Sequence, residues 1–435
     1  MLRPVLLPLM LALPLPVVLA PVPLRAGAPE PVVRVLLQEA PQVQLVAVAG
    51  SARINDEGGR VLLTLQPGER LAARLDAGQL VLRRLGPAAA APEEAGSPEA
   101  DGLLRLEPRA LWFDPLTAAA GPARGVPAVG LGDRSYRGRL QLRPGSQALQ
   151  VINHVGVENY LPGVVASEMP ASWPQAALRA QAIAARTYAL RQRRPQAPFD
   201  LKATTASQVY GGLTAETEST RQAVAATRSL VLLHGGSLIE AVFHSSSGGR
   251  TENSGELWAG QLPYLVSVGD DDSHSPVHRW QERFGPAQLQ QAFPETGGLT
   301  AVQVLATSST GRLRQLRISG PQGSLLISGA DLRQRLRLRS TQVSLTLEPP
   351  PAAGPIATAL STAPSTATLA PPEPPPLPDA APAPLPALLV EGRGFGHGVG
   401  MSQWGAHAMA LRGETADRIL QHFYRGVVIR PYSAP

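Results

Sequence analysis

The stretch VVASEMPASWPQAALRAQAIAARTYAL, from Val164 to Leu190, places a single carboxylate, Glu168, in front of a predicted helix. We expect this helix over about residues 173–192, because Ser172 is a suitable N-cap and Gln175, three residues later, completes a capping box. The face expected to pack inward carries small side chains, which allow close contact with a sheet or another backbone. The stretch therefore predicts a carboxylate fixed next to a tightly packed helix.

Glu168 is the best candidate for an acid–base residue. We expect the preceding strand to end near Leu161, so that Glu168 lies between strand and helix, beside the apolar residues Met169 and Trp173. Removal from water raises the pKa of a carboxyl and keeps it protonated as an acid. A solvated loop glutamate is the alternative, and spacing alone does not exclude it.

Composition limits the class of protein. The chain has 435 residues, a net charge of +6 and no cysteine, which excludes disulfides, thiolate catalysis and cysteine-based metal sites. A basic chain suits a polyanionic partner such as nucleic acid, anionic lipid or an acidic cell wall. The sequence has no zinc-finger spacing and no basic strand interleaved with aromatics, so we expect no nucleic-acid partner. We also expect no metal and no cofactor.

The N-terminus predicts export. Arg3 is followed by an apolar run to Leu24 and then by small residues, as in a secretory signal. An uncleaved anchor is the alternative, because the run is long enough to span a bilayer. In that case the chain would touch a membrane only through this segment. The expected location is the periplasm, the cell envelope or the extracellular space.

Composition also divides the chain into segments. We expect a signal peptide at 1–28, a small strand-rich module with a linker at 30–100, the first part of a larger domain at 103–347, a Pro/Ala-rich low-complexity insert at 348–388, and the rest of the larger domain at 389–432. If both parts form one fold, the insert is a surface excursion whose ends lie close together.

The coarse pattern predicts an α+β fold with mainly antiparallel sheets and a few helices. Further helices are expected over about 216–227 and 402–411, and a hairpin is expected to turn at Gly235 and Gly236. The segment GADLRQRLRLRS, residues 329–340, predicts a short basic helix whose charges face solvent.

Two further stretches have the composition of a binding site. FHSSSGGRTENSGELW begins at Phe243 and sets His244 beside Ser245 and Ser246. A serine hydrolase is disfavoured, because adjacent strand residues point to opposite faces and no nucleophile elbow is present. A hydroxyl-lined rim beside an imidazole suits carbohydrate better, and an ordinary polar turn remains the alternative.

GRGFGHGVGMSQWGA, residues 392–406, has glycines at alternate positions around His397. The spacing fits neither a dinucleotide fingerprint nor a phosphate loop. Glycines at period two remove one face of a strand, so we expect a polar ligand to approach the backbone there and to bind His397 and Gln403. An ordinary glycine-rich strand corner is the alternative.

Together with INHVGVENYLPGVVASEMP and SGADLRQRLRLRST, these stretches resemble the stage II sporulation protein D and amidase-enhancer family, in order along the chain. The resemblance implies a lytic transglycosylase that cleaves peptidoglycan glycan strands, preferably those stripped of stem peptides. It implies Glu168 as the catalytic residue of the S-E-M-P motif. It also implies a set of substrate-binding residues in the cleft: Arg186, Tyr188, His244, Ser245, Ser246, His397 and Gln403.

The implied chemistry needs only one carboxylate. Hydrolytic glycosidases normally use two. In lytic transglycosylation the sugar's own C6 hydroxyl attacks C1 and leaves a 1,6-anhydromuramoyl end, with Glu168 as acid and then base. The alternative is a non-catalytic peptidoglycan binder that activates an N-acetylmuramoyl-L-alanine amidase. A cell-wall amidase is thus the expected protein partner, and glycan strands are the expected ligand.

Overall fold

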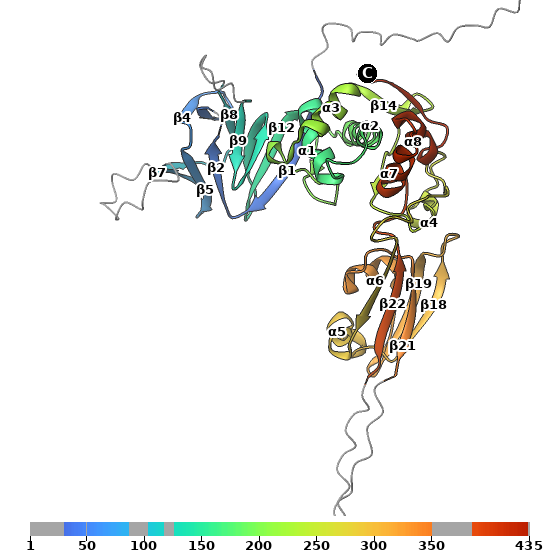
Figure 1. The fold of residues 1–435 in the computed structure, drawn as a ribbon. Coiled ribbons are helices and arrows are strands. Elements are labelled where there is room, and N and C mark those ends of the chain that lie inside the picture. Colours follow the sequence, from blue (N-terminus) through green and yellow to red (C-terminus); the bar gives the residue numbers. More distant parts are fainter. Residues whose placement is uncertain (1–29, 49, 87–102, 117–125, 350–384, 434–435) are drawn as a thin grey trace, which may run out of the picture. The chain divides into compact units, whose positions relative to one another are not determined.

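The computed structural model describes residues 30–48, 50–86, 103–116, 126–349 and 385–433 (Figure 1). The predicted signal peptide and most of the insert lie outside these ranges. The predicted α+β fold with mainly antiparallel sheets is confirmed. Among the described residues, no helix has the length and apolar character needed to cross a membrane.

Two sheets contain most strands of the first half of the chain, one mixed and one wholly antiparallel. One has the order β13-β1-β12-β11-β8-β3-β4, and the other has the order β10-β9-β2-β5-β6-β7. The first is built from Leu201–Lys202, Val32–Ala40, Leu149–Gly156, Arg139–Pro144, Leu111–Pro115, Ala52–Asn55 and Val61–Leu65. The second is built from Arg134–Arg137, Ala128–Leu131, Gln42–Ala47, Arg70–Asp76, Gln79–Leu85 and Leu103–Leu106.

The strands of residues 32–85 do not form a sheet of their own. β1 pairs antiparallel with β12, with Val33 opposite Val155, and β3 pairs with β8. Strands from both sides of the boundary expected near residue 100 therefore share the same sheets. Alternating buried residues along these strands supply the core, as the burial pattern of β2 illustrates.

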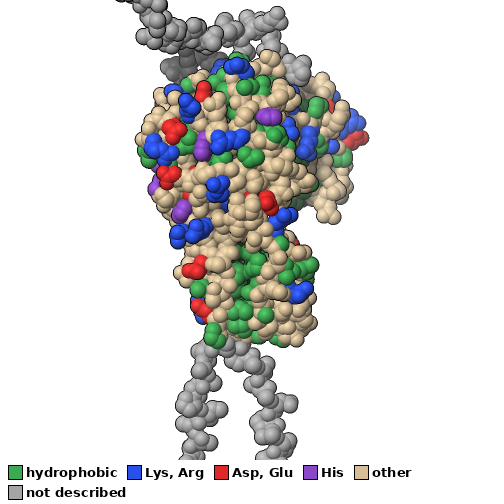
Figure 2. Space-filling model, turned by 90° about the vertical axis from the view of Figure 1, so that its right-hand side faces the viewer, with side chains coloured by type: hydrophobic (Ala, Val, Ile, Leu, Met, Phe, Trp, Pro, Cys, Tyr) green, Lys and Arg blue, Asp and Glu red, His purple; other side chains and the backbone are tan. Residues whose placement is uncertain are grey.

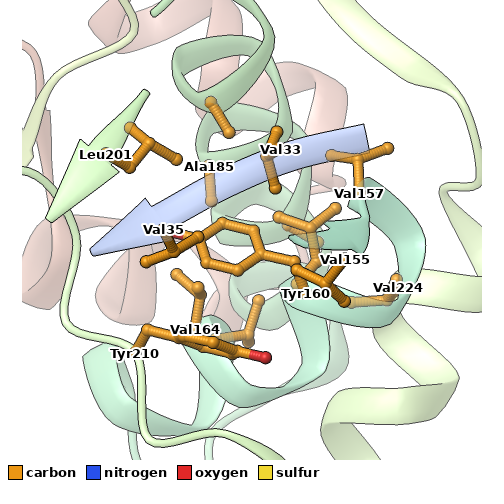
Figure 3. Packing of buried hydrophobic residues seen from close by; sticks show 14 of the residues in the cluster. Val33, Val35, Val155, Val157, Tyr160, Val164, Ala185, Leu201, Tyr210 and Val224 are labelled. Carbon is orange, nitrogen blue, oxygen red and sulfur yellow. The ribbon is translucent and has the colours of Figure 1, made fainter. Parts of the chain in front are cut away.

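Helix α1 (Val157–Glu168) packs against β1 and β12. Helix α2 (Gln175–Arg191) packs in turn against α1, α3 (Glu218–Ala226), α7 (Gln403–Leu411) and α8 (Ala416–Phe423). Figure 3 shows Val33 and Val35 of β1 in one cluster with Tyr160 and Val164 of α1 and Ala185 of α2. The core therefore lies where the sheet meets α1 and α2.

Two local expectations around Glu168 are wrong. The strand ends at Gly156, and Val157 begins helix α1, which continues through Pro162 to Glu168. Valines, a proline and a glycine give this segment poor helix propensity, and burial overrides that preference. The N-cap of α2 is Pro174, with no side-chain cap, rather than Ser172. The helix predicted over 173–192 is otherwise confirmed.

The other predicted local elements are confirmed. The hairpin turns at Gly235 and Gly236, between β14 (Leu230–His234) and β15 (Ser237–Leu238), and β14 also pairs with β24 (Val428–Pro431). The basic segment forms α6 (Gly329–Leu336). Shorter elements are the 3-10 turns Leu213–Ala215 and Pro294–Thr296, the helices α4 (Ser254–Leu257) and α5 (Pro286–Ala292), and the strands β16 (Phe243–His244) and β23 (Met401–Ser402).

A second hydrophobic cluster holds two three-stranded sheets together with α5 and α6. Their orders are β17-β22-β21 (Arg279–Phe284, Ala387–Arg393, Val343–Glu348) and β18-β19-β20 (Ala301–Thr307, Leu313–Gly320, Gly323–Ser328). Glu348 pairs with Ala387, so the two ends of the insert lie side by side. Figure 2 shows hydrophobic side chains gathered over this part of the chain, and Val304, Leu305 and Leu326 are among those exposed.

Candidate active site

A pocket of about 480 Å³ collects six of the eight predicted site residues. A larger pocket, of about 600 Å³ beside β17, β21 and β22, contains none of them. The smaller pocket is lined by the predicted residues Glu168, Tyr188, His244, Ser245, His397 and Gln403, and also by Thr205, Ala206, Ser207, Val242, Phe243, Trp258, Arg333, Phe395 and Gly396.

Strand pairing brings the two later motifs together. β16 pairs in parallel with β23, so that Phe243 lies opposite Met401 and His244 opposite Ser402. This register sets the histidine motif beside the start of α7. Ser402 caps α7 by accepting a hydrogen bond from the Gly405 N–H, which fixes the first turn that carries Gln403.

Glu168 is the last residue of α1 and is held through both carboxyl oxygens. The Val209 N–H donates to Oε1 at 2.9 Å, and Nε2 of Gln403 donates to Oε2 at 3.1 Å. Burial raises the pKa of the Glu168 carboxyl above its usual value, and the two donors offset part of that rise. The carboxyl therefore keeps a fixed orientation and a greater tendency to hold its proton.

His244 and His397 form a neutral wall of the pocket. Their ring centroids lie 5.4 Å apart. Burial lowers the pKa of His244 well below its usual value, and burial lowers the pKa of His397 to about 4. Nδ1 of His244 donates to the Val399 carbonyl at 3.1 Å, whereas Nδ1 of His397 accepts from the Val399 N–H at 3.0 Å. Neither ring carries a charge near neutral pH.

Arg186, which we predicted to bind substrate, does not line the pocket. Its side chain is fully buried and forms a bidentate ion pair with Glu158, with Nη2 2.7 Å from Oε2. It also donates to the carbonyl of Leu230. Because Glu158 lies in the first turn of α1, the pair ties α1 to α2 and supports Glu168 only through the helix.

Ser246 also points away from the pocket. Its hydroxyl donates to the carboxylate of Asp272, and the side chain is 1% exposed. Its backbone pairs with Phe395, which joins the two motifs. Ser245, on the opposite side of the backbone, lines the pocket, as the alternation of side chains along an extended segment requires.

Contrary to our expectation, Gly398 and Gly400 of the third motif do not open the face of a strand to a ligand, although Gly396 lines the pocket. Gly398 and Gly400 both have a positive φ, of 87° and 73°. A Cβ at Gly398 would meet the guanidinium of Arg312, and one at Gly400 would meet the Val242 carbonyl. Side chains are absent there because the protein itself fills the space.

Three of the lining residues that we did not predict have large or charged side chains: Trp258, Phe395 and Arg333. Trp258 and Phe395 are 40% and 43% exposed, which is unusual for large aromatic side chains. Their place inside the two motifs was the available signal. Arg333 of α6 reaches the same pocket, although we expected the charges of that helix to face solvent. Arg335, Arg337 and Arg339 follow it at alternate positions, so no local pattern distinguishes it.

Metal-binding groups do not gather in the described part of the chain: it contains no cluster of three or more His, Asp or Glu residues suited to an ion. The chemistry open to the pocket is therefore that of one acidic side chain, neutral imidazoles, hydroxyls, an amide and a cation.

Residues 145–234, which include Glu168 and all of α1 and α2, match the family model described as stage II sporulation protein. The stage II sporulation protein D of Bacillus subtilis is 32% identical over 301 residues, which cover 65% of this chain and 76% of that protein. This chain belongs to the stage II sporulation protein D family.

Two other relatives extend the comparison. The stage II sporulation protein D of Bacillus amyloliquefaciens is 30% identical over 298 residues, covering 64% of this chain and 75% of the relative. The amidase enhancer of Bacillus subtilis is 30% identical over 295 residues, covering 62% of this chain but 40% of that longer protein. The matched region therefore covers about three quarters of each sporulation protein D but less than half of the enhancer.

Proposed function

We propose that this protein is an exported lytic transglycosylase that cleaves peptidoglycan glycan strands, preferably those stripped of peptides. The observation that carries the proposal is the state of Glu168. It is the only carboxyl among the described residues that line the pocket, its pKa is raised by burial, and two N–H donors fix its orientation.

Protonated Glu168 donates its proton to the glycosidic oxygen as the bond from that oxygen to C1 breaks. The resulting carboxylate takes the proton of the C6 hydroxyl of the same sugar, whose oxygen bonds to C1. The products are a 1,6-anhydromuramoyl end and a free hydroxyl on the leaving sugar. The N–H groups of Val209 and Gln403 stabilise the carboxylate between the two proton transfers. General acid–base catalysis of this kind is worth about 10²–10⁴-fold in rate.

The pocket suits a sugar chain in other respects. An inverting or retaining hydrolase places a second carboxyl across the bond, and the described lining offers none. Trp258 and Phe395 present apolar ring faces at the pocket, while Tyr188, Ser207 and Ser245 offer hydroxyls. This mixture of flat apolar surface and hydrogen-bonding groups matches the two faces of a pyranose ring.

The alternative is a peptidoglycan-binding activator of an N-acetylmuramoyl-L-alanine amidase. The likeness to the amidase enhancer favours it, and a binder needs the same pocket. On either reading a cell-wall amidase is a partner in function, because it prepares the stripped strands or receives the stimulation.

Incubation of the purified protein with amidase-stripped glycan strands, followed by mass spectrometry, tests the proposal. Wild type is expected to produce anhydro ends with the amidase removed. Glu168→Gln is expected to lose at least about 100-fold of that rate, while the surface control Glu414→Gln keeps it. Equal rates for Glu168→Gln and wild type overturn the mechanism. No turnover by wild type, with stimulation of an added amidase, supports the alternative.

Export is part of the proposal and rests on the sequence of residues 1–28. Peptidoglycan lies outside the cytoplasmic membrane, so the enzyme meets it only after export. Cell fractionation of the full chain and of a chain lacking residues 2–28 checks this step. Equal retention of both in the cytoplasm contradicts it.

A further inference from the structure

Arg333 is the one unexpected charge in the pocket. It belongs to α6, whose Leu332 and Leu336 are buried in the second hydrophobic cluster. These anchors fix the helix and bring Arg333, half-buried, to the wall that also carries His397 and Gly396. A charged side chain withdrawn from water needs a compensating partner.

The guanidinium of Arg333 has little compensation from the protein. Within the described ranges its one hydrogen bond runs from Nε to the Leu338 carbonyl at 3.2 Å, and no ion pair is formed. Arg335, two residues on in the same helix, differs, because its guanidinium pairs with Glu295 at 2.8 Å. The N–H groups on the two terminal nitrogens of Arg333 are therefore available to a ligand.

The charges around Arg333 favour an anionic ligand. It is the only arginine or lysine among the described lining residues. His244 and His397 are neutral near neutral pH because burial lowers the pKa of both. With Glu168 protonated, as the proposed reaction requires, the pocket carries one net positive charge. Such a field attracts a ligand group of charge −1.

We propose that Arg333 binds the free lactyl carboxylate of muramyl residues whose stem peptide has been removed. This inference rests on the proposed function. While the peptide is attached, the lactyl carbonyl belongs to a neutral amide. Amidase hydrolysis converts it to a carboxylate, whose two oxygens match the planar fork of a guanidinium. Arg333 thereby distinguishes stripped strands from intact ones.

This role concerns specificity and not proton transfer. Burial lowers the pKa of the Arg333 guanidinium below its usual value, but an arginine still keeps its proton near neutral pH, so Arg333 is no general acid. Its effect is confined to ligands that carry the carboxylate. Loss of Arg333 should therefore weaken the preference for stripped strands and leave binding of neutral strands unchanged.

Binding measurements separate this inference from the proposed catalysis. Glu168→Gln protein, which does not consume the ligand, is titrated with stripped oligosaccharides and with the same oligosaccharides after conversion of the lactyl carboxylate to a carboxamide. We expect the stripped ligand to bind about 10- to 100-fold more tightly. Addition of Arg333→Gln should abolish this ratio, Arg333→Lys should retain part of it, and Arg335→Gln, on the same helix, should retain all of it.

The ratio of the affinities for the carboxylate and carboxamide ligands tests the inference. If the Arg333→Gln protein still prefers the carboxylate ligand by the wild-type factor, the inference is wrong. Thermal unfolding of each variant, and unchanged affinity for the carboxamide ligand, show that the pocket is intact. Absence of anhydro ends from wild-type protein counts against the proposed catalysis alone, because the binding ratio is measured without turnover.

Discussion

Nε2 of Gln403 lies 3.1 Å from Oε2 of Glu168, although 235 positions separate the two residues along the chain. The contact joins the first turn of α7 to the last residue of α1. It makes the amide of Gln403 part of the acid–base unit, because an N–H donor favours the ionised form of the carboxyl. The protonation of Glu168 therefore depends on a residue from the opposite end of the domain.

Gln403→Ala should shift the pH profile of glycan cleavage. Removal of the donor takes away an interaction that lowers the pKa of Glu168, so that pKa rises further. The reaction needs protonated Glu168, and its rate falls as pH rises through this pKa. The falling limb of kcat/KM should therefore move to higher pH, with a lower maximal rate. Gln334→Ala, on the exposed side of α6, is the control, and a limb that stays in place or moves to lower pH contradicts the assignment.

Arg186→Met should destabilise the protein rather than weaken ligand binding. It removes Arg186 from its buried ion pair with Glu158, a change that costs about 3–5 kcal/mol. Urea unfolding at pH 7 measures this loss. Arg191→Met, in the same helix, breaks a more exposed pair with Glu240 and should cost about 1 kcal/mol or less. Equal losses for the two variants would refute the structural role of Arg186.

Asp270→Asn should stabilise the protein more at pH 7.5 than at pH 5. Burial, with repulsion from Asp272, raises the pKa of Asp270 from 3.8 to about 6. The folded state therefore binds this proton more tightly than the unfolded state, and the stabilisation is lost as pH rises through about 6. Asparagine does not ionise. The melting temperature of the variant, relative to that of wild type, should therefore increase as the pH rises.

The exposed Asp133, in the turn between β9 and β10, provides the control for this pH effect, because it is not among the charges that shift the pKa of Asp270. The difference between Asp133→Asn and wild type should change much less between the two pH values. A difference for Asp270→Asn that stays constant or shrinks with rising pH would show that Asp270 ionises freely in the folded state.

Trp258→Ala should weaken glycan binding about tenfold, because an exposed aromatic face at the pocket is lost. Stability should change by no more than about 0.5 kcal/mol, as is usual for exposed positions. Affinity for stripped oligosaccharides and thermal unfolding measure the two effects. Leu411→Ala is the matched control, since Leu411 is 64% exposed and lies outside the pocket lining. Unchanged affinity would exclude Trp258 from the ligand site.

Local sequence predicted the elements whose patterns are self-contained. α2, the hairpin at Gly235 and Gly236, and α6 follow from periodicity and turn residues. α1 was missed because its valines, Pro162 and Gly163 favour other conformations, and its burial against β1, β12 and α2 decides the outcome.

By itself the sequence determined the lone carboxylate, the ordered motifs and the small-faced helix that follows Glu168. Only the tertiary structure decided which charges meet in the pocket. It buried Arg186 against Glu158 and brought Arg333 beside His397, although both are arginines of helices in recognised motifs. The physical reason is that a charge's role depends on the partners and the solvent around it, and packing between segments far apart in the chain sets both.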